Sequence, residues 1–282
     1  TFRFRITEDR GTLDWGNGEI NQDVVLQLME GLTLTSADGS ILPALADSWT
    51  VKGTKISFRI RKNTLWSDGQ PVCAQQFVDA WTRVRDPRTA SPYSDLLKDL
   101  KKFSAPSCER LEVELFRPSS HFPSLVSHWV FFPIRKELLA KFGAAWTRPE
   151  NLAVTGAYVL EFWERDRRYA MKKNLKYRGK PASVEKIEAL VVSDDSTALS
   201  LFETGKLDWI RDLPFLDRQR LSARPEFVAA NTLVEYHLGF NMSEKSAGNL
   251  NREQRCALAG AINRTEITRI LKGGERPAFS YD

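Results

Sequence analysis

Apolar residues recur along the chain with two periods, one typical of strands and the other of helices. Residues 55–61 alternate, with Ile56, Phe58 and Ile60 on one side, and this period of two predicts a half-buried strand. Similar patterns predict strands over residues 1–6, 109–116, 158–162 and 168–173. The last two segments are close enough in sequence to pair as a hairpin.

Helical spacing is clearest in residues 74–85, where Phe77, Trp81 and Val84 form one apolar stripe. Cys73 stands at the N-cap position of this helix, and Gln76 follows three residues later, as in a capping box. Further helices are expected over residues 22–30, 122–130, 136–142, 195–203, 216–221 and 251–271.

Three further apolar segments, residues 187–192, 207–210 and 232–241, are predicted to be strands. Strands and helices therefore alternate irregularly along the chain. This order favours an α/β or mixed α+β fold with a mixed sheet over a regular series of βαβ units.

Composition limits the class of protein but does not decide it. The chain has 282 residues, of which 42% are hydrophobic and 27% charged, as in one large globular domain or two ordinary ones. No apolar run approaches the ~20 residues that span a bilayer. A net charge of +5, with basic residues scattered among acidic ones, does not indicate a nucleic-acid partner. The chain opens on a strand-like segment without a signal peptide, which fits a cytoplasmic protein or an exported protein without its leader.

The three cysteines, Cys73, Cys108 and Cys256, form no C-x-x-C pair and have no histidine at zinc-ligand spacing. We therefore expect no metal and no cofactor. An odd number leaves at least one thiol unpaired within the chain. A Cys73–Cys108 disulfide is possible in an oxidising compartment, but sequence alone cannot test its geometry.

The sequence has none of the common catalytic motifs: no G-x-S-x-G elbow, no P-loop and no H-E-x-x-H. Asp194 and Asp195 are interpreted as the N-cap of the helix that follows and its neighbour, not as a catalytic pair. We therefore expect that the protein is not an enzyme.

Several segments resemble, in the same order, the peptide-binding proteins of ABC transporters, solute-binding protein family 5. The most specific is Phe58-Arg59-Ile60-Arg61-Lys62 followed by Trp66-Ser67-Asp68-Gly69-Gln70-Pro71-Val72. Other matching segments are Met29-Glu30-Gly31-Leu32, Leu42-Pro43-Ala44-Leu45-Ala46-Asp47-Ser48-Trp49, Thr89-Ala90-Ser91-Pro92-Tyr93, Thr155-Gly156-Ala157-Tyr158 and Ala261-Ile262-Asn263-Arg264. Cys73 departs from the threonine cap that is usual in the family.

The resemblance implies a periplasmic-binding-protein-like type II architecture. A ligand-binding lobe would comprise residues 1–42 and 182–250, an inserted smaller α+β domain residues 43–181, and residues 251–282 the start of a third lobe. Family members are longer, so we expect most of the third lobe to be missing. The apolar face of the last helix would then be exposed, which predicts self-association or a protein partner.

In this family the ligand lies extended between two lobes that close by hinge motion. The residues that would face it here are Gly18, Glu19, Ile20, Asn21, Tyr93, Ile210, Arg211, Asp212, Tyr236, His237 and Leu238. Asn21 and Asp212 would supply polar contacts, and the strand residues main-chain contacts.

The resemblance implies a receptor, periplasmic or at the cell surface, that delivers oligopeptides or dipeptides to an ABC permease in the inner membrane. Two alternatives stay open. One is a family relative that binds another solute, such as a nickel chelate, haem, an opine or a sugar. The other is a shortened relative that acts as a protein-interaction module without transport.

Overall fold

The computed structural model describes residues 1–230, 234, 236–242, 250–271 and 275–278. The chain separates into two compact units, residues 1–211 (unit 1) and 212–282 (unit 2), and each is described by itself. Among the described residues, no helix is long and apolar enough to cross a membrane.

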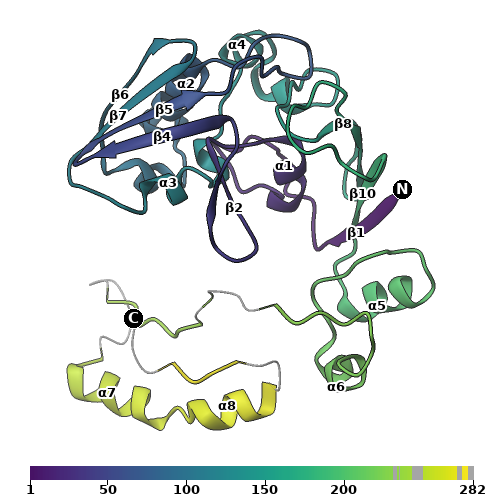
Figure 1. The fold of residues 1–282 in the computed structure, drawn as a ribbon. Helices are drawn as coiled ribbons and strands as arrows, with labels where there is room; N and C mark the ends of the chain where they lie inside the picture. Colours follow the sequence, from purple (N-terminus) through teal and green to yellow (C-terminus); the bar gives the residue numbers. More distant parts are fainter. Residues whose placement is uncertain (231–233, 235, 243–249, 272–274, 279–282) are drawn as a thin grey trace. The chain divides into compact units, whose positions relative to one another are not determined.

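Unit 1 contains two four-stranded sheets and a short hairpin (Figure 1). The first sheet has the order β1-β10-β9-β8, formed by β1 (Phe2–Ile6), β10 (Lys186–Val191), β9 (Arg168–Lys173) and β8 (Tyr158–Glu164). β1 pairs with β10 in parallel, and the other pairs are antiparallel. Part of the predicted inserted range, residues 158–173, therefore shares a sheet with the predicted ligand-binding lobe. The proposed division into lobes stays a prediction.

The second sheet is antiparallel and built from residues close in sequence. Its order is β4 (Ala46–Lys52), β5 (Lys55–Ile60), β7 (Arg110–Leu115) and β6 (Leu100–Ser107). The expected alternation in β5 is confirmed, because Ile56, Phe58 and Ile60 are buried. The hairpin of β2 (Thr33–Thr35) and β3 (Ile41–Pro43) has its turn at Asp38-Gly39.

Helix α2 (Ala74–Arg85) covers one face of the second sheet, as Figure 1 shows, and its bounds are those that the apolar stripe predicts. Trp81 is fully buried and contacts Phe103 of β6 and Phe131 edge-on, at 5.5 and 5.6 Å between ring centroids. Its indole N–H donates to the Phe131 carbonyl oxygen at 3.0 Å, so the polar group of this large core residue is satisfied.

The remaining helices are short. In unit 1 they are α1 (Gln22–Leu28), α3 (Phe122–Leu125), α4 (Lys136–Phe142) and α5 (Asp195–Glu203). In unit 2 they are α6 (Arg218–Leu221), α7 (Arg252–Ala261) and α8 (Arg264–Leu271). The predicted cap of α5 is confirmed, since the Asp194 carboxylate accepts a hydrogen bond from the Thr197 amide at 2.7 Å.

Three expectations are wrong or lie partly outside the described residues. The single helix predicted over 251–271 is two helices, because the Asn263 side chain caps α8 by accepting from the Glu266 amide at 2.9 Å. The strand predicted over 207–210 is only an isolated bridge between Phe4 and Trp209. Beside it, the Asp208 side-chain carboxylate accepts the hydrogen bond of the Arg3 amide. Of the strand predicted over 232–241, residues 232, 233 and 235 lie outside the described residues, and the described ones form no strand.

Gly156 lies where two segments approach more closely than a side chain allows. Its amide donates to the Leu28 carbonyl oxygen at 2.8 Å, and a Cβ at this position would lie 2.6 Å from the Leu28 carbonyl carbon. We expect Gly156→Ala to lower the free energy of unfolding by roughly 1–3 kcal/mol, because backbone must shift to make room. Urea unfolding measures it. Gly260→Ala is the control, since a Cβ there meets nothing within 4 Å. Equal losses in both variants would contradict the prediction.

Candidate ligand-binding site

The predicted site segment Gly18–Asn21 leads directly into α1. Glu19 is exposed and forms an ion pair with Arg10 at 2.6 Å, whereas Gly18 and Ile20 are half-buried. Asn21 is buried and stands at the N-cap of α1, but its side chain makes no cap hydrogen bond. The Asn21 side chain is therefore available for a contact other than capping the helix.

The Asn21 side chain begins a chain of hydrogen bonds that sequence reasoning missed. Its Nδ2 donates to the hydroxyl oxygen of Tyr169 in β9 at 3.1 Å. The Tyr169 hydroxyl in turn donates to Oδ1 of Asp9 at 2.6 Å. Tyr169 is completely buried, so this chain connects three segments inside unit 1.

Asp9 is the acceptor at the end of this chain, and its carboxylate is fully enclosed. It also accepts from the amides of Gly11 and Asp166 and from the Trp163 indole, at 2.9, 3.0 and 2.9 Å. Burial alone would raise the pKa of Asp9, but these hydrogen bonds together lower it below the usual value. Asp9 is therefore ionised at neutral pH.

A second carboxylate, 13% exposed, holds the loop before this segment in place. Asp14 accepts two hydrogen bonds from the Arg83 guanidinium of α2, at 2.7 and 2.5 Å, and one from the Trp146 indole at 3.2 Å. Asp14 Oδ1 also accepts from the Gly16 amide at 3.2 Å. These contacts attach the loop that leads to Gly18 to the helix of the second sheet.

Two other predicted residues of unit 1 lie at or beside the start of α1. Arg211 forms an ion pair with Asp23, two residues after Asn21, at 3.2 Å. Ile210, which precedes Arg211, is half-buried. The structure thus brings the two ends of the predicted site in unit 1 together, although they are far apart in sequence.

Tyr93 belongs to a separate aromatic cluster. Its ring contacts those of His128 and Trp129 at 6.0 and 6.1 Å, and His128 stacks on Trp129 at 3.8 Å. Burial lowers the pKa of His128, whose Nδ1 accepts from the Val130 amide at 3.2 Å. Tyr93 stands edge-on to the other two rings, and all three residues are half-buried. Aromatic groups of this kind suit a recognition pocket.

The remaining predicted residues lie in unit 2. Asp212, Tyr236, His237 and Leu238 are all exposed, with Tyr236 at 92% and Leu238 at 80% of their full accessible area. Their part in a site stays a prediction.

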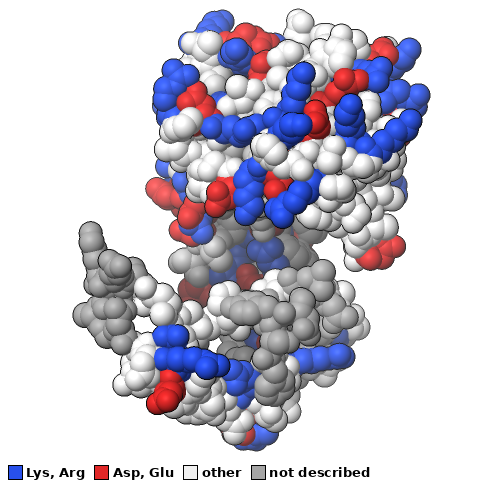
Figure 2. Space-filling model, turned by 90° about the vertical axis from the view of Figure 1, so that its left-hand side faces the viewer, with Lys and Arg blue, Asp and Glu red and all other residues white. Residues whose placement is uncertain are grey.

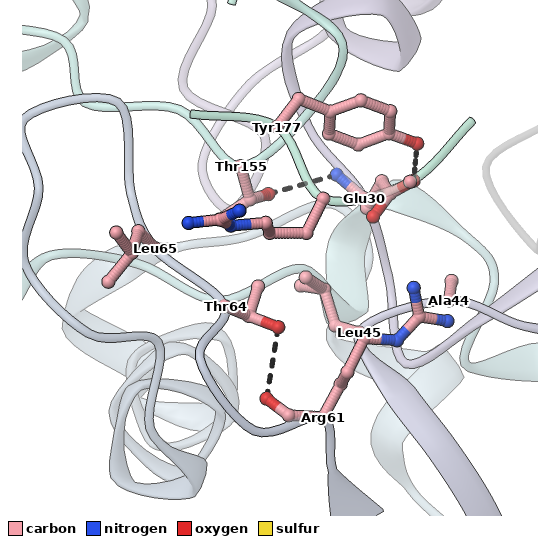
Figure 3. A pocket seen from close by; sticks show the side chains of 10 residues that line it. Glu30, Ala44, Leu45, Arg61, Thr64, Leu65, Thr155 and Tyr177 are labelled. Carbon is pink, nitrogen blue, oxygen red and sulfur yellow. Dashed lines mark hydrogen bonds between the residues drawn. The ribbon is translucent and has the colours of Figure 1, made fainter. Parts of the chain in front are cut away.

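A pocket that sequence reasoning did not anticipate surrounds Glu30 (Figure 3). The Tyr177 hydroxyl donates to the Glu30 carboxylate, and Arg61 points toward the same pocket. Burial raises the pKa of Glu30, while Tyr177 and the charge of Arg61 oppose that rise. The cavity volume is only about 10 Å³. That is far below the ~300–1,000 Å³ of typical ligand sites, so we interpret the cluster as structural.

A larger, open hollow lies alongside β8. Its lining residues are Arg148, Pro149, Glu150, Leu160, Glu161, Phe162, Trp163, Arg165 and Lys172. None of them is a predicted site residue, so the hollow is distinct from the predicted site.

Figure 2 looks onto the side of unit 1 that carries β4 to β7 in Figure 1, and it shows basic and acidic side chains interspersed. Ion pairs on this sheet agree with this view, for example Lys101 with Glu114 at 2.7 Å and Arg110 with Glu112 at 2.8 Å. This face therefore carries no single-sign basic patch of the kind that binds nucleic acid.

The order of motifs and this fold are matched by a known family. The model of the bacterial extracellular solute-binding proteins, family 5, matches residues 40–281. The chain belongs to this family. Family 5 proteins bind solutes and are not enzymes, as the absence of catalytic motifs led us to expect.

Two relatives show how much of a family 5 protein the chain represents. It is 30% identical to the probable deoxycholate-binding periplasmic protein YgiS of Escherichia coli, covering 98% of this chain and 56% of that protein. It is 31% identical to the periplasmic oligopeptide-binding protein OppA of Salmonella typhimurium, covering 94% of this chain and 52% of that protein. The chain thus spans about half the length of these relatives.

Solved family 5 structures confirm the predicted fold class. The periplasmic oligopeptide-binding protein OppAIV of Borrelia burgdorferi has a TM-score of 0.84 at 25% identity, covering 95% of this chain and 58% of that one. Haemophilus influenzae OppA, solved in complex with the peptide RPPGFSPFR, has a TM-score of 0.75 at 26% identity, covering 78% of this chain and 48% of that one.

Proposed function

We propose that this family 5 chain belongs to the substrate-binding component of a peptide ABC transporter, which captures oligopeptides or dipeptides outside the cytoplasmic membrane. The observation that carries the proposal is the family match over residues 40–281 together with relatives named as oligopeptide-binding proteins. The proposed contacts are those of the predicted site, with Asn21 as a polar group and Tyr93 as an aromatic group.

Two observations support a periplasmic or cell-surface location. Several relatives are named periplasmic proteins. Cys73 and Cys108 form a disulfide, a bond that persists in oxidising compartments and is rare in the cytosol. An ABC permease in the inner membrane is the proposed partner. Self-association through the exposed Leu258, Ile267 and Ile270 of α7 and α8 remains a prediction.

A second candidate ligand is a bile acid, because the chain is 30% identical to a probable deoxycholate-binding protein over nearly all of its length. A rigid apolar ligand with one carboxylate would use the aromatic cluster of Tyr93, His128 and Trp129 more than main-chain hydrogen bonds. The two candidates therefore predict different contacts in the predicted site.

We expect native mass spectrometry of the gently purified full-length protein to show a bound peptide, and di- to pentapeptides to raise its melting temperature. A ligand at 100 times its Kd stabilises the folded state by about 2.7 kcal/mol, which is easily measured. Deoxycholate is tested beside the peptides at matched concentrations. A shift with deoxycholate alone would favour the bile-acid candidate, and no shift with either would contradict the peptide proposal.

A further inference from the structure

The hydrogen bonds between Asp9, Tyr169 and Asn21 have a defined direction. An ionised carboxylate only accepts hydrogen bonds, so the one hydroxyl proton of Tyr169 must point to Asp9, 2.6 Å away. The Tyr169 oxygen is then left as an acceptor. It can be bonded by the NH2 group of Asn21 and not by its carbonyl oxygen.

This order determines which atom of Asn21 remains available. Nδ2 is held by Tyr169, so Oδ1 is the free end of the amide. Within the described part of the chain, Oδ1 has no hydrogen-bond partner. The unpaired side-chain atoms that are fully enclosed there are the indole nitrogens of Trp15 and Trp129. Asn21 Oδ1 is not among them, so solvent reaches it. Asn21 therefore presents an accessible acceptor at the end of a buried network.

We propose that Asp9 and Tyr169 are positioning residues that hold the Asn21 amide with its oxygen outward, so that this point of the site receives a hydrogen-bond donor of the ligand. Peptide N–H, ammonium and hydroxyl groups are such donors, whereas a carboxylate is not. The inference rests on the proposed function, because it assigns Asn21 to the ligand site.

The orientation of Asn21 is tested first without any ligand. Asn21→Asp identifies the Asn21 side-chain NH2 signals in an ¹⁵N-labelled sample by their loss. We expect these protons to exchange slowly with water in the wild type, and at least tenfold faster in Tyr169→Phe. Asp9→Asn should also speed the exchange of these protons. The new amide can donate to the Tyr169 oxygen, which would reverse the direction of the hydrogen bonds between residues 9, 169 and 21.

Trp163→Phe is the matched control. Trp163 donates to the other oxygen of Asp9 and stacks on the Tyr169 ring at 5.1 Å, but it is not a link between Asp9 and Asn21. We expect this variant to lose thermal stability while the Asn21 signals stay as in the wild type. A general loosening of the region would instead speed exchange equally in Trp163→Phe and Tyr169→Phe, and would overturn the proposal.

The second readout is the Kd for trialanine of the full-length protein and each variant. Tyr169→Phe and Asp9→Asn are expected to bind about tenfold more weakly, the effect of about one hydrogen bond, and Trp163→Phe within about twofold of the wild type. Faster exchange of the Asn21 protons together with an unchanged Kd would overturn the proposed ligand contact. If the wild type binds neither trialanine nor any peptide of the screen, the peptide function and that contact both fail, while proton exchange still decides the orientation of Asn21.

Discussion

Replacing both Cys73 and Cys108 by serine is expected to lower the free energy of unfolding by about 3–4 kcal/mol. The disulfide joins two residues that are 35 positions apart. Closing a loop of that length lowers the entropy of the unfolded chain, which raises its free energy by about 3–4 kcal/mol. In the native state the bond ties the N-cap of α2 to the turn between β6 and β7. Urea unfolding of the double variant and the wild type measures the difference.

Reduction provides an independent check of the same prediction. Dithiothreitol should lower the melting temperature of the wild type toward that of the double serine variant, and leave the variant unchanged. Cys256 is exposed and unpaired, so Cys256→Ser should behave as the wild type under both conditions. If the reductant lowers the melting temperature of the double variant as well, the disulfide is not the source of the effect.

Arg83→Leu is expected to lower the free energy of unfolding by about 3 kcal/mol. It leaves the Asp14 carboxylate without its main partner at a position where both side chains are largely buried, with 16% of Arg83 and 13% of Asp14 exposed. Urea unfolding measures the loss.

Two further variants separate this effect from general damage. Asp14→Leu combined with Arg83→Leu should lose less than the sum of the two single variants, since no charge is then left alone. Arg110→Leu breaks a pair of exposed residues, 61% and 43% accessible, and should change the stability by about 0–1 kcal/mol. A loss in Arg110→Leu as large as that in Arg83→Leu would contradict the importance of burial.

Local patterns predicted much of the fold. The stripe of Phe77, Trp81 and Val84 fixed the bounds of α2, and alternation located β5, because in both cases burial of one face selects the residues. β6 was missed, since its sequence Leu100–Ser107 contains Pro106 and does not alternate cleanly. The break at Asn263 was missed because a helix cap there competes with a long apolar stripe on both sides.

The candidate site was harder to predict because its contacts join distant parts of the chain. The resemblance to family 5 indicated Asn21, but its partner Tyr169 lies 148 positions away, and Asp9 lies 160 positions from Tyr169. No local pattern marks such a pair. The Cys73–Cys108 bond was one possibility in the sequence, and only the arrangement of α2 beside the β6–β7 turn decides it.

The parallel pairing of β1 with β10 has a consequence for the order in which the protein assembles during synthesis. Phe2 lies opposite Ile187, so β1 cannot join its sheet until nearly two hundred residues after it have been made. The sheet of β4 to β7 is complete at Leu115 and needs only nearby contacts. Since local contacts form sooner than distant ones, we expect this sheet to fold first. Until β10 is made, β1 remains unpaired, and its exposed edge can pair with other chains.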